Sequence, residues 1–176
     1  SIFVKMELQV AHDVLNSVIS KRGMMWEKIK ELKQQMSKLN SVATHELGKP
    51  QEDLMKEYYP LKHHIEGGLY TREIFMPKGH IIISFIHKQQ HPSFLMKGKV
   101  SFVNDEGMIT TVEAPHTQFT QVGTQRVFYI HEDTVWVCVY KTNAKTVEEA
   151  EKEIYASSYK QLPKKIINKA KQLWQE

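Results

Sequence analysis

The sequence predicts a mainly β protein, with an antiparallel β-barrel in the middle of the chain and α-helices at both ends. Three observations predict this fold. Between Tyr70 and Tyr140, apolar and polar residues alternate with the period of a half-buried strand. Turn-forming residues interrupt the alternation roughly every 8–12 residues, which is typical of a sandwich or barrel. The segments on either side have the period of amphipathic helices.

The first stretch of about 45 residues is expected to be helical. One apolar stripe at helical spacing extends from Val10 to Ile19, and a second extends from Trp26 to Leu39. Gly23, between the two, indicates a bend or a break into two helices. The segment 45–53 contains a glycine and a proline and is interpreted as a linker.

The middle section is expected to hold about seven short strands. They are expected at Tyr70–Met76, Ile81–His87, Phe94–Val103, Met108–Glu113, Gln118–Gln121, Gln125–His131 and Thr134–Tyr140. Turn residues at 77–79 and 104–107 separate neighbouring strands. Closing these strands into a barrel would remove exposed sheet edges, which attract further strands.

The C-terminal part returns to helix. Thr146 and Glu149 have the spacing of a capping box at a helix start, and Pro163 suits the first turn of a final helix. The length of 176 residues fits one domain of common size. We divide it into an N-terminal helical segment with a linker (1–60), a barrel (61–142) and C-terminal helices (143–176).

Composition excludes several classes of protein. Apolar residues make up 41% of the chain and charged residues 25%, the balance of a globular protein. No apolar run approaches the ~18 residues that span a bilayer. Charged residues interrupt the start of the chain, where a secretory signal would need an apolar stretch. The single cysteine, Cys138, excludes an intrachain disulfide. We therefore expect a protein that is neither secreted nor embedded in a membrane.

The formal net charge is +4, and the excess lysines gather on the first and last helices. A basic patch can attract nucleic acid. The barrel segment, however, has no row of exposed aromatic residues in a nucleic-acid motif. We interpret the lysines as solvated helix faces, so nucleic acid is not an expected partner.

Nine histidines are the most informative chemical feature. His87 and His91 lie four residues apart, where the strand expected at Ile81–His87 ends. By alternation His87 shares a face with Phe85 and the isoleucines before it, so it points into the barrel if they do. Imidazoles brought together in a concave apolar site are typical ligands of zinc, iron, manganese or nickel. The alternative is that both are ordinary polar residues at the barrel mouth.

Three further residues belong to the candidate site. His131 is interpreted either as a third metal ligand or as a histidine held by the acids that follow it. Arg72 and Glu73 lie on alternate faces of one strand, so one of them points inward and needs a partner. Glu73 could complete a mixed histidine and carboxylate site, or pair with a lysine or arginine. Trp136 is expected to line the ligand site or to belong to the core.

The stretch Gly79–Gly98 resembles the first motif of the cupin superfamily, G-x5-H-x-H-x3/4-E-x6-G. His91 falls where that motif has its glutamate, His87 falls on the second histidine, and Phe85 occupies the first. The second cupin motif is matched only weakly, and Thr120 stands at the position of that motif's histidine. Two of the four usual metal positions therefore hold nitrogen ligands.

A longer string resembles small, mostly uncharacterised cupin-like proteins that are frequent in bacteriophage genomes. It includes Tyr70–Gly79, Gly123–Arg126 and His131–Trp136, within roughly residues 60–155. The resemblance implies a double-stranded β-helix, or jelly-roll barrel, that binds a small ligand. Cupins include enzymes, sugar-binding modules and storage proteins, so the resemblance leaves open whether this chain is an enzyme.

The expected site therefore has two parts. The ligand-binding residues are expected to be Glu73, Phe85, Thr120 and Trp136. A divalent cofactor (zinc, iron, manganese or nickel) is expected at His87, His91 and His131.

The sequence is compatible with two functions. The first is a cupin-like phage protein that binds a small ligand and a divalent metal in its barrel. The second is a non-enzymatic virion or assembly component whose barrel and terminal helices dock onto other phage structural proteins. Either would lie in the host cytoplasm or in the virion. The apolar stripe from Val10 to Leu39 is longer than the barrel would cover, so a homo-oligomer is expected.

Overall fold

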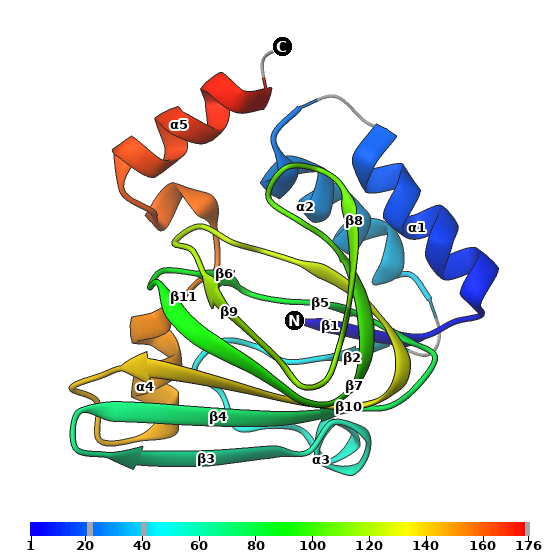
Figure 1. Cartoon of the computed structure of the whole chain (residues 1–176). Coiled ribbons are helices and arrows are strands. Elements are labelled where there is room, and N and C mark those ends of the chain that lie inside the picture. The colour runs from blue at the N-terminus through cyan, green and yellow to red at the C-terminus, as the bar shows by residue number, and fades with distance from the viewer. Residues whose placement is uncertain (21–22, 40–41, 175–176) are drawn as a thin grey trace.

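The computed structural model describes residues 1–20, 23–39 and 42–174. In these residues the chain forms a strongly curved antiparallel sheet that closes into a barrel, with helices packed against its outside and its ends (Figure 1). The fold class expected from the sequence, an antiparallel jelly-roll barrel with helices at both ends of the chain, is confirmed.

The elements have the following bounds. The strands are β1 (Ile2–Lys5), β2 (Val42–Thr44), β3 (Leu61–Glu66), β4 (Leu69–Met76), β5 (His80–Ile83), β6 (Ile86–His87), β7 (His91–Val103), β8 (Ile109–Glu113), β9 (His116–Thr120), β10 (Val127–Lys141) and β11 (Tyr155–Ala156). The helices are α1 (Leu8–Ser20), α2 (Met25–Met36), α3 (Asp53–Tyr58), α4 (Val147–Ile154), the short η1 (Tyr159–Gln161) and α5 (Lys164–Trp174).

Strand β10 organises the barrel. Its first part pairs with β5, its last part pairs with β4, and β7 pairs with it along most of its length. The path β2-β1-β5-β10-β4-β3 forms one wall, and β7 carries β8 and β9 on its other edge. A separate two-stranded sheet, β6 with β11, closes one end. The interior of the barrel is therefore framed by strands from almost the whole chain.

The prediction of two separate strands at 125–131 and 134–140 is wrong, because most of these residues form the single strand β10 of 15 residues. The register between β7 and β10 shifts at Glu132 and again at Val135. These irregularities absorb the polar residues 131–133, which the sequence pattern suggested were a turn. Bulges of this kind bend a strand without ending it.

The first residues are also different from the helix that was expected. Ile2, Phe3 and Val4 are buried in β1, which lies between β2 and β5 in the main sheet. Two apolar β-branched residues and a phenylalanine suit a strand that is covered on both faces. The helices begin only at Leu8. The polar strand β3 was not expected either, because a strand with histidine, lysine and glutamate lacks a clear alternation.

Helices α1 and α2 cover the outer face of β1 and β5. Leu15 and Val18 of α1 and Ile29 of α2 pack against Ile81 and Ile83 in one apolar cluster. The two isoleucines therefore point toward the helices and not into the barrel, so the condition under which alternation would place His87 inside the barrel is not met. Most of the apolar stripe is covered within the chain. The homo-oligomer expected from that stripe stays a prediction without this support.

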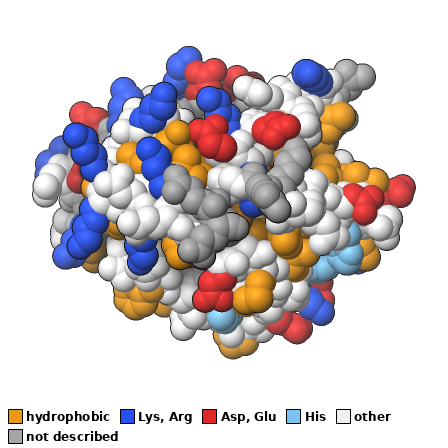
Figure 2. All heavy atoms as spheres, turned by 90° about the horizontal axis from the view of Figure 1, so that it is seen from above, with side chains coloured by type: hydrophobic (Ala, Val, Ile, Leu, Met, Phe, Trp, Pro, Cys, Tyr) orange, Lys and Arg blue, Asp and Glu red, His pale blue; other side chains and the backbone are white. Residues whose placement is uncertain are grey.

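The C-terminal helices follow the sequence pattern. The backbone N–H of Glu149 donates to Thr146 Oγ1 at 3.2 Å, which caps the start of α4. Helix α5 packs its apolar side near Trp26 and Leu162, and its lysines are exposed. Figure 2 shows the molecule from above the view of Figure 1, and Lys and Arg side chains gather there on the side where α5 lies. No helix in the described ranges is long and apolar enough to cross a membrane.

Candidate functional site

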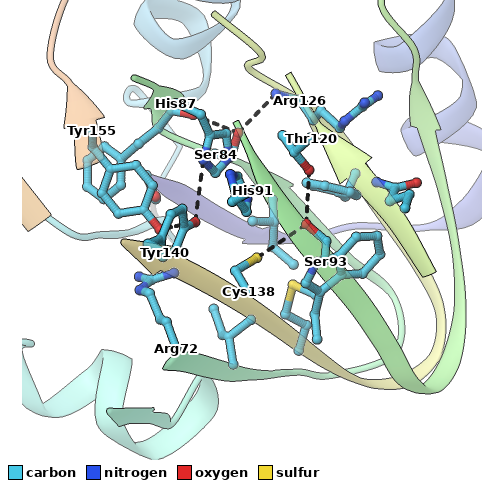
Figure 3. Close-up of a pocket in the computed structure, with 18 of the residues that line it drawn as sticks. Arg72, Ser84, His87, His91, Ser93, Thr120, Arg126, Cys138, Tyr140 and Tyr155 are labelled. Atoms are coloured by element: carbon cyan, nitrogen blue, oxygen red, sulfur yellow. Dashed lines mark hydrogen bonds between the residues drawn. The ribbon is translucent and has the colours of Figure 1, made fainter. Parts of the chain in front are cut away.

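A cavity of about 80 Å³ lies inside the barrel. Strands β4, β7, β9 and β10, together with the small sheet β6–β11, contribute its walls (Figure 3). The apolar part of the lining is largely aromatic and includes Phe3, Phe85, Phe128, Trp136, Tyr140 and Tyr155, with Ile74, Ile82 and Met76. Space of this size holds several water molecules or a ligand of a few non-hydrogen atoms.

A break between β5 and β6 brings a second set of side chains inward. Ile82 lines the cavity, and after it the chain leaves the regular strand at Ser84 and Phe85. The Ser84 N–H donates to the carbonyl of Arg126, and the Arg126 N–H donates to Ser84 Oγ. Because the alternation is interrupted here, Phe85 and His87 also reach the cavity.

His87 and His91 lie together in the wall, with ring centroids 4.7 Å apart. His91 is 1% exposed, and its Nδ1 donates to the carbonyl of Gln89 at 2.9 Å. This bond fixes the neutral tautomer, so the lone pair of His91 Nε2 is left without a partner. On the other ring, His87 Nδ1 lies 3.4 Å from the Tyr140 hydroxyl, which is 3.0 Å from the Tyr155 hydroxyl.

Both histidines of the cavity are held neutral. Burial lowers the pKa of His87 well below its usual value, and the charges of Arg72 and Arg126 and the neighbouring His91 lower it further. Burial also lowers the pKa of His91, against the bond to Gln89. Near neutral pH the two imidazoles therefore act as neutral hydrogen-bonding groups and not as cations.

Two arginines line the same cavity and approach it from different sides (Figure 3). Arg72 comes from β4 and lies with its Cζ 5.6 Å from the centroid of the Tyr155 ring, while its Nε has no hydrogen-bond partner. Arg126 comes from the segment before β10 and stacks its Cζ 4.4 Å from the centroid of Phe102. Its Nε and Nη1 are also buried without a partner. Its Nη2 lies 3.9 Å from the exposed carboxylate of Asp105.

Further polar side chains line the cavity. The hydroxyls of Ser93 and Thr120 are 2.9 Å apart, and Ser93 Oγ lies 3.7 Å from Cys138 Sγ. The side-chain amide of Gln118 contacts His116 Nε2 through its Oε1. Its Nε2 has no hydrogen-bond partner. Burial raises the pKa of the Cys138 thiol, so it stays protonated and suits packing better than nucleophilic attack.

The structure brings together five of the seven residues expected from the sequence. Phe85, His87, His91, Thr120 and Trp136 all line the cavity.

Glu73 and His131 lie elsewhere. Glu73 is on the outer side of β4, with a carboxylate oxygen 3.3 Å from Lys62 Nζ. His131 Nε2 lies 2.6 Å from the Ser101 hydroxyl, and its ring faces Tyr129, whose side chain packs with the α1 and α2 cluster. Neither residue lines the cavity. Of the Arg72 and Glu73 pair, it is the arginine that points inward.

The donor set of the cavity does not fit a divalent metal. Within residues 1–20, 23–39 and 42–174, no three histidine, cysteine, aspartate or glutamate side chains gather as a metal site. The cavity lining contains no aspartate or glutamate, and it contains two arginines. A divalent cation beside His87 and His91 would meet two guanidinium charges with no carboxylate to offset them.

Comparisons with known proteins show similarity in fold only. No protein-family model matches the sequence, and no curated protein matches it. The fold is similar to that of ectoine synthase from P. lautus, with a TM-score of 0.46 and 9% identity over 55% of this chain and 72% of that chain. It is also similar to an acetylacetone dioxygenase from Acinetobacter johnsonii, with a TM-score of 0.39 and 20% identity over 58% and 78% of the two chains.

A third similar structure is the Cupin_2 domain of an XRE family transcriptional regulator from Enterobacter cloacae. Its TM-score is 0.40 and its identity is 10%, over 48% of this chain and 96% of that chain. These three likenesses concern part of the chain and are too distant to transfer a ligand, a metal or a reaction.

Proposed function

We propose that the barrel binds one small organic molecule in its central cavity. One observation carries the proposal. In the part of the chain that the structure describes, five buried side-chain nitrogens have no hydrogen-bond partner, and all of them belong to residues that line this cavity. The residues are Arg72, His91, Gln118 and Arg126.

Unpartnered polar groups in a protein interior are costly. Each buried donor or acceptor without a partner costs about 1–3 kcal/mol, and a native structure contains few of them. Because all four residues line one cavity, a molecule bound there would supply the missing partners. The aromatic walls suit an organic molecule, because they offer apolar contact between the polar groups.

The phage association and the virion role remain expectations from sequence resemblance. Nothing in the fold or the site favours a docking role over ligand binding. An inert scaffold would also gain stability from filling the cavity with apolar side chains, whereas this barrel keeps polar groups there.

The first prediction tests whether the cavity is the binding site. Thermal unfolding is measured with a library of small fragments for the wild type and for Ser93→Leu, which fills the cavity from β7. The matched control is Thr117→Leu, which places the same side chain at an exposed position of β9. A fragment present at 100 times its Kd should stabilise the wild type and the control by about 2.7 kcal/mol, and Ser93→Leu far less.

Two results would contradict the proposed function. One is a library in which no fragment stabilises the wild type. The other is stabilisation of Ser93→Leu and the wild type by the same fragments to the same extent, which would place binding outside the barrel.

A further inference from the structure

We infer that the molecule bound in the barrel is an organic oxyanion, such as a small carboxylic acid, held by Arg72 and Arg126. This inference rests on the proposed function and names the class of ligand. It replaces the divalent cation that the sequence suggested for the same cavity with a ligand of opposite charge.

The first argument is the direction of the missing hydrogen bonds. Four of the five unpartnered nitrogens carry protons: Arg72 Nε, Gln118 Nε2, and Arg126 Nε and Nη1. The ligand must therefore present mainly acceptor oxygens. Guanidinium groups form their strongest hydrogen bonds with carboxylate and phosphate oxygens, because the charges and the planar geometries match.

The second argument is charge. The lining residues include two arginines and no aspartate or glutamate. Among the residues that the structure describes, the one carboxylate in ion-pair contact with Arg126 is that of Asp105, at 3.9 Å and exposed at the surface. In the described residues, no carboxylate lies within ion-pair distance of Arg72. Glu151 acts on Arg72 through its charge, but its carboxylate already contacts His45 Nε2 and accepts the N–H of Gly48.

Buried positive charge without a counter-charge is unstable unless an anion offsets it. The hydroxyl groups of Tyr140 and Tyr155 cannot supply that charge, because burial raises the pKa of both phenols. A bound anion would add the direct counter-charge that Glu151 and Asp105 supply only from a distance.

The third argument concerns the shape of the ligand. Arg72 and Arg126 lie on different sides of the cavity, and Tyr140 and Tyr155 lie on the side of Arg72 (Figure 3). A single atom such as chloride would contact one guanidinium and leave the other donors unpartnered. A molecule with an oxyanion and an apolar body would contact an arginine and the aromatic wall together. The lone pair of His91 Nε2 further fits a hydroxyl donor on that body.

The test uses ligands that differ in charge but hardly in shape. Propionate, propionamide and propionamidine form one such set, and benzoate, benzamide and benzamidine form another. Inorganic phosphate is the arm for an oxyanion without an organic body. Zinc, manganese and nickel salts are the metal arm. Binding to the full chain is measured by ligand-observed NMR and by titration calorimetry in buffer without other oxyanions.

The anion of each set is expected to bind at least tenfold more tightly than the amide, with no measurable binding of the amidine. Phosphate and the metals are expected to bind more weakly than the organic anion. Arg72→Met should reduce binding of the anion to the level of the amide and leave the amide unchanged. Glu73→Gln, the neighbouring residue on the outer side of β4, is the control and should bind like the wild type.

Each other outcome has a defined meaning. Amides that bind as tightly as the anions, or anions unaffected by both Arg72→Met and Arg126→Met, would overturn the oxyanion and leave the cavity as a binding site. Stoichiometric binding of a metal that His87→Ala abolishes would also overturn it. If no compound of either set binds, this inference fails, and the fragment library described above decides the proposed function separately. Arg126→Met decides the question if Arg72→Met does not fold.

Discussion

Gly98 is the position at which the backbone of β7 lies close against β10. It has a φ of +96°, and it lies opposite the bulged part of β10. A Cβ added at Gly98 would lie 2.6 Å from the carbonyl oxygen of Asp133 and 2.8 Å from Thr134 Cα, and it would also meet the Thr134 hydroxyl. Backbone atoms cannot move aside as a flexible side chain can. Only glycine therefore fits between the two central strands.

The second prediction follows from this contact. Gly98→Ala should lower the free energy of unfolding by roughly 3 kcal/mol or more, from positive φ and steric overlap together. Gly67→Ala is the matched control, because Gly67 has a φ of +59° but nothing within 4 Å of an added Cβ. Its cost should be about 1 kcal/mol. Urea unfolding measures both, and equal losses would show that the packing at Gly98 does not matter.

At the same scale, sequence reasoning found the histidine pair but not the arginines. His87 and His91 could be found from a motif and from strand alternation. The alternation also showed that Arg72 or Glu73 points inward, but it could not say which, since that depends on the register of β4 with β10. Arg126 was expected inside the strand Gln125–His131, but β10 begins only at Val127 and Arg126 lies in the irregular segment before it. Its position depends on the bonds between Ser84 and its own backbone.

At the scale of elements, one buried pair joins α4 to the segment before α3. The carboxylate of Glu151 is 1% exposed, with both oxygens 3.1 Å from His45 Nε2, and one of them accepts the N–H of Gly48. Burial acts to raise the pKa of Glu151, but the bond with His45 and the charge of Arg72 hold it below its usual value. The pair thus connects residues that are 106 positions apart.

The third prediction is that Glu151→Ala lowers the free energy of unfolding by about 3 kcal/mol, because it leaves His45 and the Gly48 N–H unpartnered in the interior. Glu46→Ala removes an exposed pair with Lys49 and should cost far less, because solvent screens the pair. Chemical denaturation of the two variants provides the comparison. Equal effects would mean that the buried pair contributes no more than the surface pair.

Elements with a strong period were predictable, and elements defined by their neighbours were not. The helical stripes and the capping box at Thr146 correspond to α1, α2 and α4. Strand β1 was missed because a run of three apolar residues fits a helix start as well as a strand. Strand β10 was divided in two because a bulge and a turn use the same residue types.

At the scale of the whole molecule, several partly or fully buried histidines are held in a neutral form. Burial lowers the pKa of His80, His87, His91 and His131. Each of these groups binds a proton more readily in the unfolded chain, where the pKa of histidine is about 6.5. The stability they provide is therefore fully present above pH 6.5 and is lost as the pH falls below it.

The fourth prediction is a steep loss of stability between pH 6.5 and pH 5, with each such histidine contributing up to about 1.4 kcal/mol per pH unit. His80 offers a test outside the cavity, since it is buried and its Nδ1 contacts the Tyr59 hydroxyl at 2.5 Å. The slope should be smaller in His80→Gln than in the wild type. His64→Gln, at an exposed position of β3, is the control. Identical slopes in all three proteins would contradict the prediction.

The small sheet β6–β11 has a consequence for how the chain can be shortened. Tyr155 follows α4 and pairs with His87, so the last wall of the cavity is made only after residue 142, where the barrel was expected to end. Truncating the chain at residue 142 would open the cavity to solvent and expose its aromatic wall. A shortened form that keeps the whole cavity wall must therefore include the chain at least through Ala156. If the proposed ligand failed to bind a shorter form, the missing β11 and not an unfolded barrel would explain it.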